Sequence, residues 1–156
     1  MADDFDFISA SDKPALLAFS TPEWLDAAKT ALQELGYKVH TAATHGDFLI
    51  RFSQFRYHVV ILEELFAANS IAENSTLEAL QHMPMSQRRL ATIILFGASF
   101  QTFTPMQAFQ QSVNAVINPS EIFLLKQLVE KAVTDNTFFL HSYREAQANL
   151  YASVKD

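Results

Sequence analysis

Val59-Val60-Ile61-Leu62-Glu63 places a glutamate directly after four aliphatic residues. A short, continuous apolar run of this kind is typical of a strand buried on both faces of a parallel sheet. Such a strand brings its last residue to the carboxyl edge of the sheet, where open α/β folds carry their binding sites and their chemistry. The run therefore predicts an α/β fold and makes Glu63 the first candidate functional residue.

Four further apolar segments predict the other strands of a five-stranded parallel sheet. They are residues 15–19, 37–41, 90–96 and 115–117, and the third strand covers residues 57–62. Between the strands, apolar residues recur at helical spacing. The predicted helices cover about residues 22–35, 48–55, 76–83 and 105–112. This alternation predicts a doubly wound parallel sheet with helices on both faces.

The first predicted helix carries signals at both ends. Thr21 can cap its start, and Pro22 suits the first helical position because its missing N–H costs little there. Gly36 suits the end of the helix. Ser120 is expected to cap the last helix in the same way as Thr21.

The last predicted helix is longer than one domain needs. Apolar residues continue at helical spacing from about Ser120 to Ala152, roughly 33 residues, and a single-domain core would use about half of that length. The surplus either kinks back over the domain or projects and pairs with another copy, and residues 134–137 are poor helix formers. We divide the chain into a tail (1–13), a domain (14–134) and a C-terminal helical extension (135–156).

Composition restricts the class of protein. The 156 residues are 49% hydrophobic and 18% charged, which is typical of an ordered globular domain. The net charge is −6, and Arg88-Arg89 is the one adjacent basic pair, which argues against nucleic-acid binding. There is no cysteine, no signal-peptide pattern and no apolar stretch long enough for a membrane span. We expect a cytoplasmic protein.

Motifs of common enzymes and metal sites are missing. The five histidines form no HExxH or HxxxH pattern, and no GxSxG, GxGxxG or P-loop motif occurs. Glu63 and Glu64 are neighbours on a strand, so their side chains should point to opposite faces rather than act as paired acids. We therefore predict no metal, no cofactor and no catalytic residue.

Two segments allow alternative interpretations. The alternation Phe5-Asp6-Phe7 either belongs to a loose N-terminal tail or pins that tail to the domain or to a partner. The segment 99–103 carries two phenylalanines after the fourth strand. It either packs over the sheet edge or forms a contact surface there.

The order of these elements, together with local motifs, resembles the receiver domains of bacterial two-component response regulators over roughly residues 14–132. The motifs are Pro22-Glu23, Gly36-Tyr37, Ala42-Ala43, Val59 to Glu63, Ile93 to Ala98, and Ala115 to Pro119. The resemblance implies a receiver fold and a role in phosphorelay signalling.

The resemblance also implies where the active-site positions of the family fall. Glu63 takes the place of the phosphoacceptor, and Phe19 and Ser20 that of the acidic pair that holds Mg²⁺. The switch hydroxyl, the lysine and the moving aromatic fall on Gly97, Asn118 and Ala115. None of these positions carries the residue of the family.

These departures imply a degenerate pseudo-receiver that is not phosphorylated. Mg²⁺ binds hard oxygen ligands, which Phe19 lacks and Ser20 offers only as a neutral hydroxyl. Without metal and lysine, nothing offsets the charge of a transferring phosphoryl group. Glu63 itself either imitates a phosphorylated aspartate, which would fix the domain in one state, or is a polar residue left at a strand end.

We therefore expect a non-catalytic signalling or scaffolding module that binds a protein partner and self-associates through residues 120–152. In receivers, dimers form on a face that maps here to about 105–132. The candidate interface residues, any of which could instead belong to the core, are Met106, Phe109, Leu125, Leu128, Phe138, Phe139, Tyr143 and Leu150.

Two alternative functions remain. The first is a residual receiver that binds a phosphate-like or other small ligand at the strand ends, around Ser20, Glu63 and Asn118. The second is an enzyme on a flavodoxin-like fold. A ligand site predicts a pocket with convergent polar groups, whereas a docking module predicts an exposed apolar patch.

Overall fold

The structure is a computed structural model that describes residue 9, residues 11–88 and residues 90–155. The Phe5-Asp6-Phe7 alternation lies outside the described residues.

A five-stranded parallel sheet forms the centre of the molecule, as the sequence predicts. The strands are β1 (Pro14–Ala18), β2 (Lys38–Ala42), β3 (Val59–Glu63), β4 (Thr92–Phe96) and β5 (Ala115–Ile117). Their order in the sheet is β2-β1-β3-β4-β5, and each neighbouring pair is parallel. Every residue of β1, β3, β4 and β5 is buried, which explains their continuous apolar sequences.

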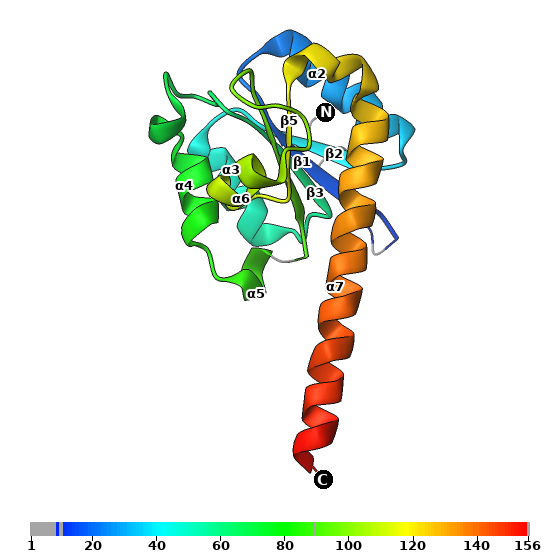
Figure 1. Cartoon of the computed structure of the whole chain (residues 1–156). Coiled ribbons are helices and arrows are strands. Elements are labelled where there is room, and N and C mark those ends of the chain that lie inside the picture. Colours follow the sequence, from blue (N-terminus) through cyan, green and yellow to red (C-terminus); the bar gives the residue numbers. More distant parts are fainter. Residues whose placement is uncertain (1–8, 10, 89, 156) are drawn as a thin grey trace.

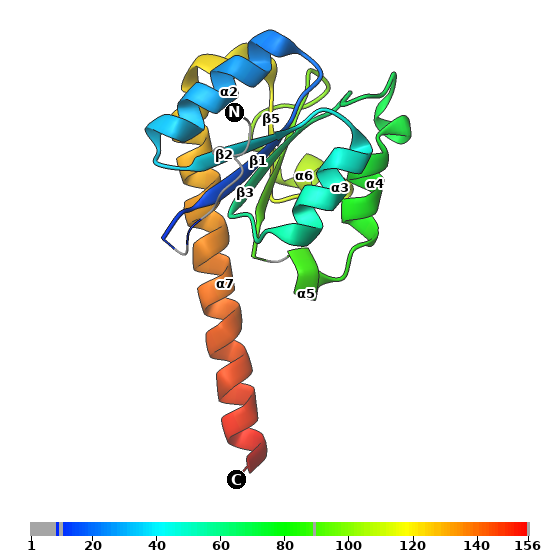
Figure 2. The same ribbon diagram turned by 180° about the vertical axis from the view of Figure 1, so that it is seen from behind.

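Helices cover both faces of this sheet (Figures 1 and 2). The helices are α2 (Pro22–Glu34), α3 (His45–Gln54), α4 (Ser75–His82), α5 (Met85–Arg88), α6 (Pro105–Gln111) and α7 (Leu125–Lys155). Two 3₁₀ segments lie at Ile71–Glu73 and Pro119–Leu124. Helices α2 and α7 pack on one face, and α3, α4 and α6 pack on the other.

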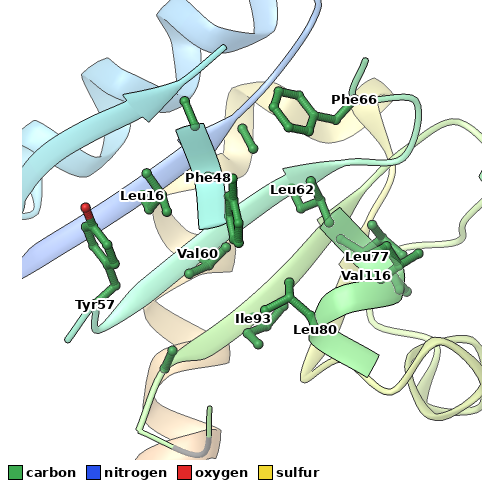
Figure 3. Packing of buried hydrophobic residues seen from close by; sticks show 14 of the residues in the cluster. Leu16, Phe48, Tyr57, Val60, Leu62, Phe66, Leu77, Leu80, Ile93 and Val116 are labelled. Atoms are coloured by element: carbon green, nitrogen blue, oxygen red, sulfur yellow. The ribbon is translucent and has the colours of Figure 1, made fainter. Parts of the chain in front are cut away.

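Two apolar clusters fill the spaces between the sheet and its helices. On the face of α3 and α4, alternate strand residues meet large helix side chains (Figure 3). The labelled residues of this cluster are Leu16, Phe48, Tyr57, Val60, Leu62, Phe66, Leu77, Leu80, Ile93 and Val116. The intervening strand residues, such as Leu17 and Ile61, face α2 and α7. The period of two along each strand therefore divides the core.

The short helix α5 was not predicted from the sequence. It ends at Arg88, whose buried guanidinium donates to the carbonyl oxygen of Leu80 at 2.7 Å and to that of Ser112. Burial lowers the pKa of this guanidinium below its usual value. Arg88 thus satisfies carbonyl groups near the ends of α4 and α6.

The last helix differs from its predicted start. Residues Pro119–Leu124 form a 3₁₀ segment in which Glu121 has non-helical angles, and the α-helix begins at Leu125 rather than at Ser120. Asn118, not Ser120, caps the segment, because its side chain accepts from the Ser120 N–H. From Leu125 onward the helix is continuous to Lys155.

Helix α7 does not kink back over the domain; its second half projects away from it (Figures 1 and 2). It runs without interruption through residues 134–137, whose weak helical propensity is overridden by contacts of Asn136. The buried amide of Asn136 donates to the Thr92 hydroxyl at 3.0 Å and accepts from the Asn114 side chain at 3.2 Å. Thr92 begins β4 and Asn114 precedes β5, so α7 leaves the domain at the amino edge of the sheet.

Candidate functional site

The Glu63 side chain lies at the carboxyl edge of the sheet and points to the start of α2. Its Oε1 accepts from the backbone N–H groups of Ser20 at 3.1 Å and Thr21 at 3.0 Å. Its Oε2 accepts from the Thr21 hydroxyl at 3.3 Å. The residue is only 4% exposed. Since a carboxylate is favourable near a helix N-terminus, these contacts hold the charge of Glu63 inside the domain.

The role predicted for Thr21 is wrong in one respect. Thr21 is the N-cap residue of α2, but its side chain makes no capping hydrogen bond to the helix. Its hydroxyl instead donates to Glu63, 42 residues later in the chain. A long-range partner of this kind cannot be read from local capping patterns.

Ser20 connects two loops at this edge. Its hydroxyl accepts from the backbone N–H of Ala67 at 2.7 Å, so the loop after β1 is tied to the loop after β3. Ala67 has φ of 46°, in the left-handed region. The hydroxyl that would have to serve as a metal ligand is therefore already used within the domain.

Glu64 is a site residue that the sequence did not reveal. It is buried, and its Oε1 accepts from the Ser99 N–H at 3.3 Å. A Cβ built on Gly97 would overlap both Cβ and Oε1 of Glu64. The space that a side chain at position 97 would need is thus filled by Glu64, which explains the glycine there.

Asn118 organises the loop that follows β4. Its side-chain N–H groups donate to the carbonyl oxygens of Phe100 at 2.7 Å and Ala98 at 3.4 Å. Its own backbone N–H donates to the Thr102 hydroxyl at 2.9 Å. The resemblance places the lysine of receivers at this position, and here the uncharged amide contacts carbonyl groups of the loop.

The aromatic residues of the segment 99–103 pack against the domain. Phe100 is buried in the cluster on the α3 and α4 face. Phe103 is half-buried on the other face, where the Lys131 ammonium lies 5.1 Å from its ring centre. Of the two interpretations of this segment, the structure thus favours packing over the sheet edge.

Asn74 is a second residue that sequence reasoning missed. Its side-chain N–H groups donate to the carbonyl oxygens of Glu63 and Glu64, each at 3.1 Å. Its Oδ1 accepts from Leu77 N–H and so caps α4. An asparagine directly before a helix is a recognisable cap, and that signal could have located its backbone, but not its contacts with β3.

The other positions that the resemblance assigns to an active site belong to the core. Phe19 is 6% exposed, and its ring packs edge-on against Phe96 at 5.5 Å between centres. Trp24 packs on the same Phe96 ring at 5.2 Å. Ala115 is buried in the sheet. Neither Phe19 nor Ala115 presents a polar atom to the edge where Glu63 lies.

The candidate interface residues divide into two groups. Leu125 is buried and Leu128 half-buried in the α2–α7 cluster, so both serve the core rather than a surface. The other six are exposed. They are Met106 and Phe109 on α6, and Phe138, Phe139, Tyr143 and Leu150 on the projecting half of α7.

Other kinds of site find no support in the part of the chain that the structure describes. No group of three or more His, Asp or Glu side chains there could hold a metal ion. Within residues 9, 11–88 and 90–155, no helix has the length and apolarity needed to cross a membrane. A cavity of about 660 Å³ lies at the amino edge of the sheet, lined by Phe52, Phe55, Tyr57 and Met83 among others, and so is remote from Glu63.

Neither a protein-family model nor a curated protein matches this sequence. Solved structures are similar to it. The chemotaxis response regulator CheY4 of Vibrio cholerae is 16% identical with a TM-score of 0.62, and the match covers 78% of this chain and 99% of that one. A CheY-like receiver domain protein of Methanospirillum hungatei is 18% identical with a TM-score of 0.63, over 81% and 98% of the two chains.

A third similar structure is NtrX of Brucella abortus, solved with ADP. It is 14% identical with a TM-score of 0.63, and the match covers 93% of this chain and 30% of NtrX. Identities this low establish the fold alone. The chain therefore has the fold of CheY-like response regulator receiver domains, with a long helix at its C-terminal end.

Proposed function

We propose that this chain is a non-catalytic signalling or scaffolding module of the two-component type, which works without phosphorylation and acts by binding proteins. The observation that carries the proposal is the engagement of Glu63. Its carboxylate accepts from the Ser20 and Thr21 N–H groups and from the Thr21 hydroxyl. The group at the phosphoacceptor position is thereby used as a structural tie between β3 and α2.

The neighbouring positions support this proposal because they lack the chemistry of phosphoryl transfer. Such a transfer depends on metal ions and cationic groups that stabilise the developing charge. Phe19 is a core residue, the Ser20 hydroxyl is bonded to Ala67, and the Asn118 amide is bonded to carbonyl groups. None of the three offers a negative ligand for Mg²⁺ or a positive charge for a phosphoryl group.

The same contacts favour a constant state over a switch. A switch needs a side chain that responds to charge at Glu63, but Gly97 has none and Ala115 has no polar or aromatic group. Glu64 fills the space beside Gly97. We infer that Glu63 holds the β1–α2 loop in one conformation.

Exposed apolar residues support a function in protein binding. Phe109 on α6 is 80% exposed and Met106 beside it is 62% exposed. The projecting half of α7 exposes further aromatic and aliphatic side chains. Large exposed apolar side chains that gather on one element are typical of contact surfaces. We propose that α7 mediates homodimerisation and that α6 contributes to binding a second protein.

A residual ligand site at the same edge is the weaker candidate. Phosphate-like ligands need free donors, and the donors here are already bonded within the domain. The Ser20 and Thr21 N–H groups contact Glu63, and the Asn118 amide contacts Phe100 and Ala98. An anion would also have to approach the carboxylates of Glu63 and Glu64.

An amide NMR titration with Mg²⁺ and then beryllofluoride, a phosphoryl mimic, tests this proposal. We expect no shifts at Ser20, Glu63, Gly97 and Asn118. A receiver domain with a complete active site, titrated in the same buffer, is the positive control. Saturable shifts clustered at these four residues would show a working phosphoryl site and contradict the proposal.

A further inference from the structure

One apolar stripe runs along both halves of α7. In the first half it consists of residues that are buried against the domain, among them Val129 and Ala132, and it ends at the buried amide side chain of Asn136. Tyr143 and Leu150 follow Asn136 by seven and fourteen residues. A step of seven residues returns to within about 20° of the same direction on a helix. Tyr143 and Leu150 therefore continue the domain-facing stripe.

The stripe is covered in the first half and uncovered in the second. Tyr143 is 47% exposed and Leu150 64% exposed, although they lie on the face that is buried up to Asn136. Phe139 and Ala146 lie on the same side and are exposed as well. The projecting half thus presents an apolar face of the kind that helices bury against a partner.

The opposite side of the projecting half is different in character. It carries the His141–Glu145 pair, whose Nε2 and Oε1 atoms lie 3.5 Å apart, and Asn149. Phe138 also lies away from the stripe, about 140° around the helix from Tyr143. The asymmetry identifies the side through which a partner would pack.

The position of the domain restricts how a second copy can pack there. The stripe of the first half is occupied by the sheet and α2, down to the contacts of Asn136 with Thr92 and Asn114. Suppose that a second α7 packed on this face in the same direction and register. Its residues before Asn136 would then overlap the domain of the first copy. A helix that runs in the opposite direction meets no such obstacle, since it ends where the domain begins.

We propose that the projecting halves of two copies pair antiparallel through this stripe. The inference rests on the homodimerisation proposed above and adds its geometry. Residues 137–155 are about 28 Å long, and full overlap puts the two-fold axis beside Ala146 and Gln147. Tyr143 of each copy then lies opposite Leu150 of the other, and the two domains lie at opposite ends of the helix pair.

The size of the contact fits a reversible dimer. Two helices that pair over about 28 Å bury roughly 1,000 Å² in total, at the low end of specific interfaces. The dimer is therefore expected at micromolar concentrations. In the antiparallel arrangement, the end of each helix lies close to the amino edge of the partner's domain.

A distance between two spin labels tests the arrangement. Gln127 is exposed on the outer side of α7, and the chain has no cysteine, so Gln127→Cys gives one labelled site per copy. The antiparallel pair predicts a distance of about 60 Å between the labels. A parallel pair predicts less than about 35 Å, because paired helices lie about 10 Å apart.

The outcomes separate this inference from the proposed function. A short distance in a dimeric sample would overturn the antiparallel pairing and leave homodimerisation intact. A monomeric mass at tens of micromolar would overturn both the pairing and homodimerisation. Neither result bears on the beryllofluoride titration, which tests the absence of phosphorylation by itself.

Matched substitutions test the stripe. Tyr143→Glu and Leu150→Glu are expected to raise the dissociation constant of the dimer at least tenfold, because each puts a charge into the apolar stripe where the two helices meet. Phe138→Glu, five residues from Tyr143 on the other side of the helix, is expected to leave the dissociation constant within about twofold. An equal loss with Phe138→Glu, or no loss with the other two, would overturn the assignment of the stripe.

Discussion

The carboxyl edge of the sheet and the projecting half of α7 stand in contrast. At the edge, the polar side chains of Glu63, Ser20 and Asn118 each have partners within the domain. On the projecting helix, Tyr143 and Leu150 lie on an apolar face that the domain leaves uncovered. The polar groups at this edge are therefore bonded within the domain, whereas the apolar face of the helix is left uncovered.

The two regions lie at opposite edges of the sheet and make independent contacts. Glutamate at the end of β3 accepts from the N–H groups before α2 and so links these two elements. The helix leaves from the other edge of the sheet, where Asn136 meets Thr92 and Asn114. The association that we propose for α7 therefore needs no event at Glu63.

The largest expected effect comes from adding a side chain at Gly97. Gly97→Thr forces a Cβ into Glu64 and should lower the free energy of unfolding by about 2–4 kcal/mol. Urea denaturation measures this loss. Combined with Glu64→Gly, which removes the overlapping atoms, the additional cost of Gly97→Thr should shrink markedly. A Gly97→Thr variant as stable as the natural chain would show that Glu64 does not occupy this space.

The next largest effect comes from removing the Glu63 carboxylate, which links β3 to the start of α2. Glu63→Ala leaves the Ser20 and Thr21 N–H groups without their acceptor and should cost about 2–3 kcal/mol of stability. Glu63→Gln keeps one acceptor oxygen and should cost about half as much. Thermal or urea unfolding of the two variants provides the comparison. If both behave like the natural chain, the carboxylate is not a structural tie.

A smaller effect distinguishes the two halves of α7. Asn136→Ala removes two buried hydrogen-bond partners and should lower domain stability by about 1–2 kcal/mol. Asn149→Ala, on the exposed half, is the matched control and should change it by less than about 0.5 kcal/mol. Equal losses in urea unfolding would mean that the exposed half also packs on its own domain.

The smallest effect on the stability of the domain is expected from a substitution in the apolar stripe of α7. Tyr143→Glu should shift the free energy of unfolding by less than about 0.5 kcal/mol when measured below the dissociation constant of the dimer. At tens of micromolar the same variant should lose dimer mass. A large loss of stability in the dilute sample would place Tyr143 in the core of the single copy.

Elements with continuous apolar runs could be predicted well from the sequence. Strands β3 and β5 lie within two residues of their predicted bounds, since buried strands leave little choice of apolar residues. The position of Glu63 at the sheet edge followed from the same argument. The start of α7 at Leu125 could not be predicted by this argument. Asn118 and Pro119 begin a 3₁₀ segment, and its residue pattern resembles the first turn of an α-helix.

Contacts between distant loops could not be predicted. Thr21 reaches Glu63, Asn74 reaches the end of β3, and Glu64 fills the space at Gly97, each across at least ten residues of chain. Such contacts depend on loop conformation, for which a single sequence carries weak signals. The resemblance identified the positions that depart from the receiver pattern, but it carried no information on the contacts that their side chains make.

Sedimentation equilibrium tests the central claim most directly. The samples are the full chain and a version that ends at Thr137, which keeps Asn136, each at tens of micromolar with and without Mg²⁺ and beryllofluoride. We predict a dimer for the full chain and a monomer for the shortened one, both unchanged by the phosphoryl mimic. A monomeric full chain, or a mass that changes with beryllofluoride, would contradict the account.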